Sequence, residues 1–320
     1  ADITLVRQRT ARVSGIVRDA QGRPGLAGSL NLIPSQSSST LATGVGARVG
    51  DGGAFEFPNV PPGRYVIQVY RGARNRSTEG EFGALTVSVG ERDIEGLTVQ
   101  ATAGSTITGR VSFLGAAPGA TPARSGIDIE AVPSDPDLAP FSGHATADIR
   151  PDWTFALSGI NGPRRLEVTR TPPGWMVEYV RARGIDVTDQ PLVFGTAAQS
   201  VEDVEIVLTD RVTRILGRVR GRDGRAAVGA TAIVFAPTRD RWYAQSRYVR
   251  AAPVGEDGRF SVEGLPSGLY YVAAVASVPA GGADAWRDPA FLDSLVVPST
   301  SVSVGDGGRA EVTLSVIESR

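Results

Sequence analysis

The sequence predicts an all-β protein built as three tandem antiparallel β-sandwich modules in an elongated arrangement. A stretch with the order Asp-Gly turn, short strand, Gly/Pro turn and apolar strand occurs at residues 51–67 and 256–272, and a weaker copy occurs at 152–166. The 39 Gly and 21 Pro residues are scattered between short Val, Ile and Leu runs, which is typical of proteins with many strands and turns. The 320 residues are enough for two or three domains, each with its own core.

Each repeat begins with a short strand that carries a glycine, and a second apolar strand follows. First strands are predicted at 13–17, 107–111 and 215–219, and second strands at 29–33, 126–132 and 231–235. The repeated stretch then supplies two strands that we predict to pair as one hairpin, with Phe260 and Tyr270 both facing the core. Closing strands are predicted at 84–89, 97–99, 204–208, 302–304 and 310–316.

The spacing of the repeats sets the predicted domain boundaries. The opening glycines, Gly15, Gly109 and Gly217, are separated by 94 and 108 residues, which is too long and uneven for a solenoid of stacked short repeats. The predicted modules are therefore module 1 (residues 1–103), module 2 (104–210, a degenerate copy) and module 3 (211–320), joined by linkers of a few residues.

Two further predictions concern single elements. One short helix is predicted at 288–295, because Asp288 suits the N-cap position and Pro289 the first turn. Trp153 and Trp175 are predicted to fill the core of module 2.

The composition excludes several classes of function. A formal net charge of −1 argues against a general nucleic-acid or anionic-membrane binder, which needs a basic excess. All 33 basic residues are Arg, so neither a Schiff-base lysine nor a P-loop lysine exists in this chain. No run of about 18 apolar residues occurs, so no transmembrane helix is expected.

Catalysis is not expected either. The chain has no Cys and one His, His144, whereas zinc hydrolases use several ligands and a Ser–His–Asp triad would depend on that residue alone. The acidic pairs at 135 and 137 and at 202 and 203 are interpreted as solvated loop residues, with part of a calcium site as the alternative. No catalytic residue, metal ion or cofactor is therefore predicted.

One pattern of turn and core residues links this chain to a known family. It comprises Gly15, Asp19, Gly22, Gly52, Phe55, Pro61, Pro62, Gly63 and Tyr65, and it recurs at Gly217, Asp257, Gly258, Phe260, Leu265, Gly268 and Tyr270. The pattern resembles the carboxypeptidase regulatory-like domain, an Ig/transthyretin-like β-sandwich, in three copies over most of the chain. The resemblance implies accessory or adhesive modules of secreted bacterial proteins, without the peptidase domain that gives the family its name.

The segment of module 3 around residue 245 is the predicted interaction surface, because Trp, Tyr and Arg are enriched in interface hot spots. Its candidate residues are Arg239, Arg241, Trp242, Tyr243, Arg247, Tyr248 and Arg250, with Trp286 as a further member. The alternative, which we favour, is that Trp242 and Tyr248 cover the core while the arginines are solvated. Exposed aromatic side chains would equally suit a sugar, so the pattern leaves protein and glycan partners open.

The function predicted from the sequence is that of a non-catalytic scaffold or accessory subunit. We expect it to dock on the periplasmic or extracellular face of an envelope or membrane protein complex, with other proteins as partners. The first residues, 1–3, suit a mature terminus left after removal of a signal peptide, in agreement with that location. The alternative is a carbohydrate-binding or adhesive accessory module.

Overall fold

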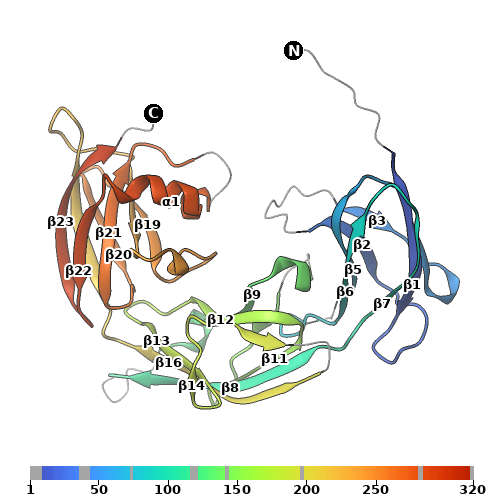
Figure 1. The fold of residues 1–320 in the computed structure, drawn as a ribbon. Helices are drawn as coiled ribbons and strands as arrows, with labels where there is room; N and C mark the ends of the chain where they lie inside the picture. The colour runs from blue at the N-terminus through green and yellow to red at the C-terminus, as the bar shows by residue number, and fades with distance from the viewer. Residues whose placement is uncertain are drawn as a thin grey trace. The chain divides into compact units, whose positions relative to one another are not determined.

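The structure is a computed structural model that describes residues 9–35, 44–72, 75–115, 122–140, 144–194, 198–279 and 284–317. Their regular secondary structure is almost entirely β-strand, so the predicted all-β class is confirmed (Figure 1). The described residues fall into two compact units. The first unit takes in strands of modules 1 and 2, and the second takes in module 3 together with Pro172–Glu178. The division into three modules stays a prediction, and the module names are kept here for their residue ranges.

The predicted strands are present in all three modules. Module 1 contains β1 (Ala11–Arg18), β2 (Ser29–Pro34), β3 (Val45–Ala47), β4 (Ala54–Val60), β5 (Gly63–Arg71), β6 (Glu81–Val89) and β7 (Ile94–Gln100). Module 2 contains β8 (Ser105–Leu114), β9 (Asp128–Pro133), β10 (Thr146–Ala147), β11 (Thr154–Ile160), β12 (Gly162–Arg170), β13 (Met176–Ala182), β14 (Ile185–Asp186), β15 (Leu192–Phe194) and β16 (Ser200–Thr209).

Module 3 contains β17 (Arg214–Arg220), β18 (Thr231–Phe235), β19 (Val249–Pro253), β20 (Arg259–Glu263), β21 (Gly268–Val275), β22 (Thr300–Val304) and β23 (Arg309–Ile317). The predicted helix is α1 (Pro289–Val296), and the Asp288 carboxylate caps it by accepting hydrogen bonds from the backbone N–H groups of Ala290 and Phe291. Short 3₁₀ turns are η1 (Asp51–Gly53), η2 (Arg124–Gly126), η3 (Pro136–Leu138), η4 (Arg239–Arg241) and η5 (Ala285–Arg287).

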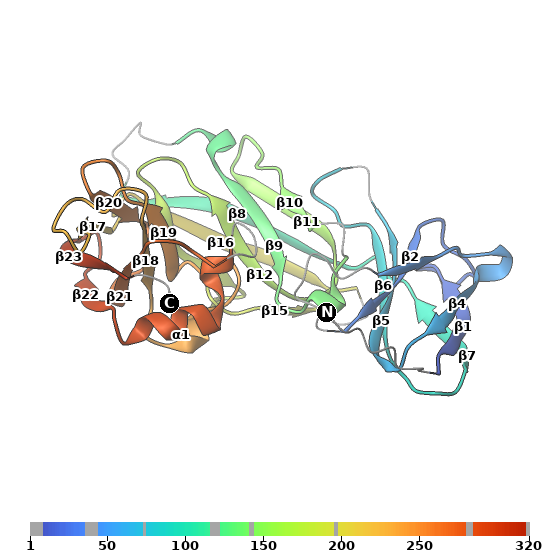
Figure 2. The same ribbon diagram turned by 90° about the horizontal axis from the view of Figure 1, so that it is seen from above.

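The same pairing of strands recurs in each module. The opening strand lies between the strand before the repeated turn and a closing strand, in the orders β4-β1-β7, β11-β8-β16 and β20-β17-β23. The second strand pairs with a short edge strand and with the strand after the repeated turn, in the orders β3-β2-β5, β10-β9-β12 and β19-β18-β21. Figure 2 shows the two layers that result in module 1.

The repeated stretch is not the hairpin that the sequence predicts. β4 pairs with β1, whereas β5 pairs with β2 and β6, so the two strands belong to different sheets. The Gly/Pro turn between them carries the chain from one sheet to the other, and the turn between β11 and β12 does the same. In module 3, β20 and β21 are likewise not paired with each other, but β23 pairs with both β17 and β21 and so joins the two layers into one sheet. Alternating apolar residues appear in both arrangements, and therefore periodicity cannot distinguish a hairpin from a crossing between sheets.

A tyrosine fixes this sheet-crossing turn in modules 1 and 3. The hydroxyl of Tyr270 donates to the carbonyl of Pro266 at 2.7 Å, and the hydroxyl of Tyr65 donates to the carbonyl of Pro61 at 3.0 Å. In both cases the acceptor lies four residues upstream, and proline at that site has no N–H of its own to satisfy. This resembles the tyrosine corner of other β-sandwiches, which closes a sheet-to-sheet connection.

The glycine of each opening strand is required by close packing. A Cβ on Gly15 would lie 2.2 Å from the Leu97 carbonyl oxygen of the neighbouring closing strand, and one on Gly109 would lie 2.1 Å from the Val204 carbonyl oxygen. In module 3 the ring of Phe260 occupies that space over Gly217, which is its direct cross-strand partner. A side chain at any of these positions would separate the opening strand from its neighbour.

The sheets contain both parallel and antiparallel strand pairs, whereas the sequence predicts antiparallel pairs alone. β1 pairs in parallel with β7, and β17 pairs in parallel with β23. The reason is the crossing turn, because the chain leaves the first sheet after β4 and returns to it only with the closing strand. A strand that returns through the other sheet can enter in the same direction as the opening strand.

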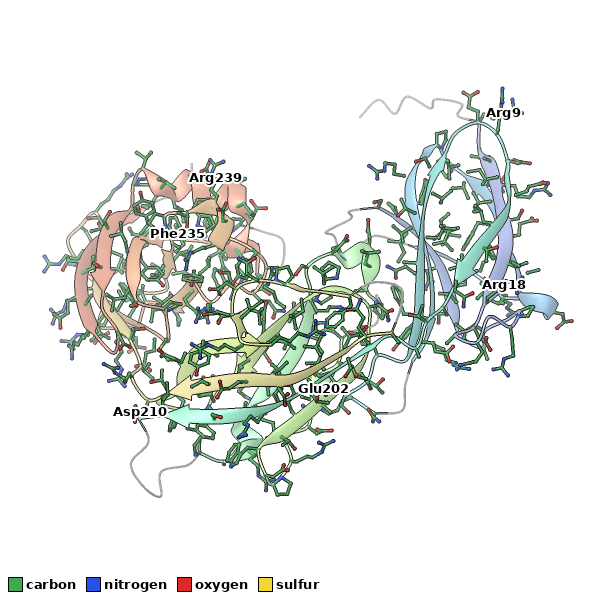
Figure 3. The ribbon with its side chains drawn as sticks, turned by 60° about the horizontal axis from the view of Figure 1, so that its bottom comes forward. Arg9, Arg18, Glu202, Asp210, Phe235 and Arg239 are labelled. Carbon is green, nitrogen blue, oxygen red and sulfur yellow. The ribbon has the colours of Figure 1, made fainter. Side chains whose placement is uncertain are left out.

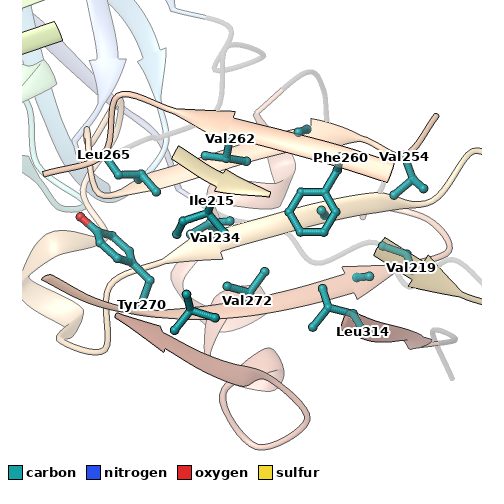
Figure 4. Close-up of a cluster of buried hydrophobic side chains, with 14 of the residues drawn as sticks. Ile215, Val219, Val234, Val254, Phe260, Val262, Leu265, Tyr270, Val272 and Leu314 are labelled. Atoms are coloured by element: carbon teal, nitrogen blue, oxygen red, sulfur yellow. The ribbon is translucent and has the colours of Figure 1, made fainter. Parts of the chain in front are cut away.

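Module 3 has a core on each face of its β18–β21 sheet. Phe260 and Tyr270 face the inner core together with Val234 and Val272, as predicted (Figure 4). The opposite face of the same strands packs under α1 and the loop after β18, through a second cluster that includes Phe235, Trp242, Leu292 and Leu295. Burial on both faces explains why residues 232–235 and 272–275 are apolar without alternation.

We expect that Tyr270→Phe will lower the local free energy of unfolding of module 3 by about 1–2 kcal/mol, because it removes one hydrogen bond while keeping the ring in the core. Tyr65→Phe is the matched control, and it should cost less because that turn is exposed to water. Hydrogen exchange of peptides from β5 and β21 measures both, since a chain of several modules need not unfold in one step. Equal losses in the two variants would contradict this role of burial.

Candidate functional site

Two of the four aromatic residues of the predicted interaction surface lie inside module 3. Trp242 is 4% exposed, packs edge-on against Phe235 at 5.6 Å and donates its indole N–H to the Ala236 carbonyl at 2.7 Å. Tyr248 is 6% exposed and belongs to the inner core with Tyr270. The loop after β18 therefore places one aromatic side chain in each of the two cores.

The arginines around this loop contact the loop and the chain segments beside it. The Arg241 guanidinium lies 3.9 Å above the Tyr248 ring, and Arg247 donates to the Val177 carbonyl at 3.3 Å. Arg250 donates to the carbonyl of Ser246 at 2.9 Å, and Arg287 donates to the same carbonyl at 3.3 Å. Because Ser246 is fully buried, these guanidinium groups satisfy a backbone acceptor that water does not reach.

The remaining candidates lie nearer the surface. Arg239 forms an ion pair with Asp293 of α1, and Figure 3 shows Arg239 above the buried Phe235. Tyr243 and Trp286 are half-buried, and the Arg287 guanidinium lies 4.2 Å from the Trp286 ring centre. One face of that ring is therefore covered by the chain's own cation.

The structure agrees with the alternative in which this segment covers the core. Trp242 and Tyr248 are not available to a partner, because both are buried among aliphatic and aromatic side chains. Arg247 and Arg250 hold the loop in place. Arg239 and Arg241 are exposed and Tyr243 and Trp286 are half-buried, and whether these four contact another molecule stays a prediction.

The other polar candidates from the sequence have structural partners. His144 lies 2.9 Å from the Glu130 carboxylate, and the Asp135 carboxylate caps η3 by accepting from the Asp137 N–H at 2.9 Å. Over the described ranges of the chain, no three His, Cys, Asp or Glu side chains gather as they would to hold a metal ion. The same ranges contain no helix of the length and apolar character needed to span a membrane.

The prediction that Trp153 and Trp175 fill the core of module 2 is wrong. Both are only half-buried, and Trp153 has a positive φ of 67° at the turn before β11. Trp175 packs edge-on against Phe113 at 5.1 Å, within the second compact unit. The core positions are taken by smaller strand residues, such as Phe155, Leu157 and Ile107.

The most deeply buried charges in the described chain were not predicted from the sequence. The Arg164 guanidinium donates to the Glu79 carboxylate at 2.7 Å, and both side chains have 1% exposure or less. Glu79 comes from the β5–β6 loop of module 1, whereas Arg164 lies on β12 of module 2. Arg164 also donates through Nε to the Asn161 carbonyl at 2.7 Å and through a terminal nitrogen to the Ala131 carbonyl at 3.3 Å.

Backbone hydrogen bonds surround this ion pair. The N–H of Ser158 donates to the Ser77 carbonyl at 2.9 Å, and the N–H of Glu79 donates to the Ser158 carbonyl at 3.1 Å. Residues 77–79 thus pair in parallel with β11, which is the edge strand of its sheet. Gly159 allows this approach, because a Cβ there would lie 2.7 Å from the N–H nitrogen of Gly80.

The electrostatics of the pair are dominated by burial. Burial raises the pKa of the Glu79 carboxyl to about 7, although the Arg164 guanidinium and the Ala145 N–H oppose the shift. Burial likewise lowers the pKa of Arg164, against the attraction of Glu79. Both shifts favour the neutral forms, as expected where the cost of removing two charges from water exceeds their mutual attraction. The cost of burying the two charges therefore offsets much of the stability that their attraction adds.

The position of Arg164 in the repeat corresponds to that of the corner tyrosine in the other modules. Arg164 stands two residues after Gly162, as Tyr65 stands after Gly63, and it occupies the same register, opposite Pro133 where Tyr65 is opposite Pro34. Its Nε closes the sheet-crossing turn on the Asn161 carbonyl, as the tyrosine hydroxyl does in the other modules. The turn of module 2 is one residue shorter, because Arg164 follows Phe155 by nine residues whereas Tyr65 follows Phe55 by ten, and this difference hides the correspondence in the sequence.

Comparisons with known proteins add little. No family model matches the chain, and no curated protein matches it. Solved structures that align with it include the Bacillus anthracis TIE protein (10% identity, 97% of this chain and 50% of that chain, TM-score 0.22) and a streptococcal ancillary pilin (12%, 96% and 99%, 0.26). The minor pilin of Streptococcus agalactiae aligns at 13% identity over 62% of this chain and 96% of that chain, with a TM-score of 0.31. The chain spans half the length of the TIE protein, and TM-scores this low support no inference about fold or function.

Trp242→Ala should destabilise module 3 by about 3–5 kcal/mol, because it leaves a cavity beside Phe235 and removes the hydrogen bond to Ala236. Arg241→Ala should cost about 1 kcal/mol or less, because it removes a contact of an exposed guanidinium with a ring. Scanning calorimetry of the full chain measures both changes. Similar, small losses in both variants would show that Trp242 is not part of the core.

The Glu79–Arg164 pair predicts a pH dependence of stability. The folded state keeps the Glu79 proton up to a pH of about 7, whereas the unfolded chain releases it near its ordinary pKa of 4.5. The free energy of unfolding contributed by this group therefore falls as pH rises through that window. The free energy of unfolding of the wild type, relative to that of Glu79→Gln, should increase as the pH is lowered from about 8 to about 5. Urea unfolding measures this difference.

Glu91→Gln, on the exposed β6–β7 turn, controls for the loss of one negative charge in the same experiment. A stability difference for Glu79→Gln that stays constant over this pH range would contradict the raised pKa.

Proposed function

We propose that this chain is a non-catalytic structural protein that acts outside the cytoplasm as a scaffold or accessory subunit of an envelope protein complex. The observation that supports the proposal best is the buried junction between modules 1 and 2, which contains the Glu79–Arg164 ion pair. A flexible linker between modules needs no such contact, and a buried ion pair adds little net stability. Its value is in fixing the relative position of the two modules, which is what a scaffold requires.

Further polar contacts support the same role for the junction. Thr102 in the linker donates to the Asn161 side chain at 2.7 Å, and the Ser35 hydroxyl donates to Asp137 at 2.6 Å. Gln68, which is buried on the outer face of β5, donates to the Asp137 carbonyl at 3.2 Å. Each contact joins module 1 to module 2 within one compact unit, so the two modules should move together.

The docking surface that we propose is smaller than the one predicted from the sequence. It consists of Arg239, Arg241, Tyr243 and Trp286, which retain exposed surface around the loop after β18. Arginine beside aromatic rings suits a protein partner, because guanidinium groups bind carboxylates and stack on rings at interfaces. A sugar platform is less favoured, since Arg287 covers one face of Trp286.

The test is co-purification of the full, tagged chain from the cells that produce it, after mild crosslinking. The expected result is a defined set of envelope proteins whose yield falls with Arg241→Ala. Arg92→Ala is the matched control, because Arg92 is an exposed arginine on the β6–β7 turn of module 1, and it should leave the yield unchanged. A chain that is recovered alone, or that binds saturably to a polysaccharide panel instead, would contradict the proposal.

A further inference from the structure

The outer face of the β20-β17-β23 sheet forms a groove of about 820 Å³ in module 3. Its charged lining residues are Arg218, Arg259, Arg309 and Glu311, and the hydroxyls of Ser261 and Thr313 lie among them. Neither the predicted interaction surface nor the proposed function makes use of this face.

The charges in the groove are not balanced. Arg218 and Arg259 are direct cross-strand partners on β17 and β20, and both are exposed. Like charges directly opposite one another in a sheet are destabilising. Arg259 lies 3.4 Å from Asp257 and Arg309 lies 2.7 Å from Glu311. The Arg218 side chain has no ion pair or hydrogen bond with any part of the chain that the structure describes. The groove therefore favours a negatively charged occupant.

The groove adjoins an edge strand. β20 is the last strand in its sheet order, with β17 as its paired neighbour. The backbone on its other side can accept an additional extended strand, a common mode of peptide recognition. No aromatic ring faces outward among the lining residues, since Phe260 is buried in the core, so the groove lacks the stacking platform that a sugar would use.

Module 2 provides an internal example of a segment added at the corresponding edge strand. Its β11 is the counterpart of β20, and residues 77–79 of module 1 pair with it at Ser158. The acidic side chain of that added segment, Glu79, is received by an arginine of module 2. By register, Glu263 on β20 corresponds to Ser158, and its carboxylate is held by Arg214 at 3.0 Å.

We propose that the free edge of β20 and the adjoining groove bind an extended acidic segment of a partner protein, added parallel to β20. Arg218 and Arg259 would pair with carboxylates on alternate residues of that segment, since alternate side chains of a strand point to one face. The inference goes beyond the proposed function, because it names a separate surface and the chemistry of its ligand.

The test is fluorescence anisotropy of the full chain with a labelled peptide of about eight alternating Thr and Glu residues. Binding is expected to weaken as salt is raised, and a matched Thr/Lys peptide should not bind. Arg218→Gln should weaken binding of the acidic peptide by about 3- to 10-fold, because one exposed charge pair is lost. Arg92→Gln, in module 1, is the control and should bind as wild type does.

Hydrogen exchange identifies the mode of binding in the same samples. Strand addition should slow exchange of backbone amides within 259–263 when the peptide is present. Three results would overturn the proposal: no binding of the acidic peptide, equal binding by Arg218→Gln and wild type, or unchanged exchange in β20. Binding of polygalacturonate in place of the peptide would also overturn it, and would assign the groove to an acidic glycan. None of these results bears on co-purification through the loop after β18, so the two proposals can fail separately.

Discussion

The turn that carries the chain from one sheet to the other is the constraint on which each module depends. A two-layer sandwich needs its chain to leave one sheet and enter the next without exposing backbone polar groups to the core. In modules 1 and 3 the tyrosine hydroxyl meets this need by donating to a proline carbonyl, while its ring fills the space between the layers. The crossing also forces the closing strand to return beside the opening strand, which explains both the parallel pairing and the small residue required at Gly15 and Gly217.

Module 2 meets the same constraint with a charged residue, and the consequence extends beyond the module. A tyrosine hydroxyl has one proton to donate, and the corner uses it fully. The Arg164 guanidinium has five N–H donors, so after closing the corner it still requires acceptors in a buried site. The Ala131 carbonyl and the Glu79 carboxylate supply them. A corner that is local in the other modules thus becomes one of the contacts that join modules 1 and 2 within one compact unit.

Local patterns in the sequence predicted the strands, the short helix and the inward-facing Phe260 and Tyr270, because periodicity and turn residues report which face of an element is buried. They did not predict which strands pair, since the crossing at Pro266 and a hairpin have the same alternation. For the candidate site, the pattern of Trp, Tyr and Arg around Trp242 could not separate an interface from a core, because both are rich in aromatic residues. Arg164 was missed because its partner Glu79 is 85 residues away in the sequence.

One position, on the edge strand that precedes the crossing turn, differs among the three modules in whether a further strand is added there. Register makes Pro58 on β4, Ser158 on β11 and Glu263 on β20 equivalent. Proline cannot donate a hydrogen bond, so Pro58 discourages an added strand. At Ser158 an added segment of the same chain pairs with β11. At β20 no added strand is present in the part of the chain that the structure describes. An open edge presents backbone N–H and C=O groups to which another strand can pair. The proposed acidic segment would occupy in module 3 the position that residues 77–79 occupy in module 2.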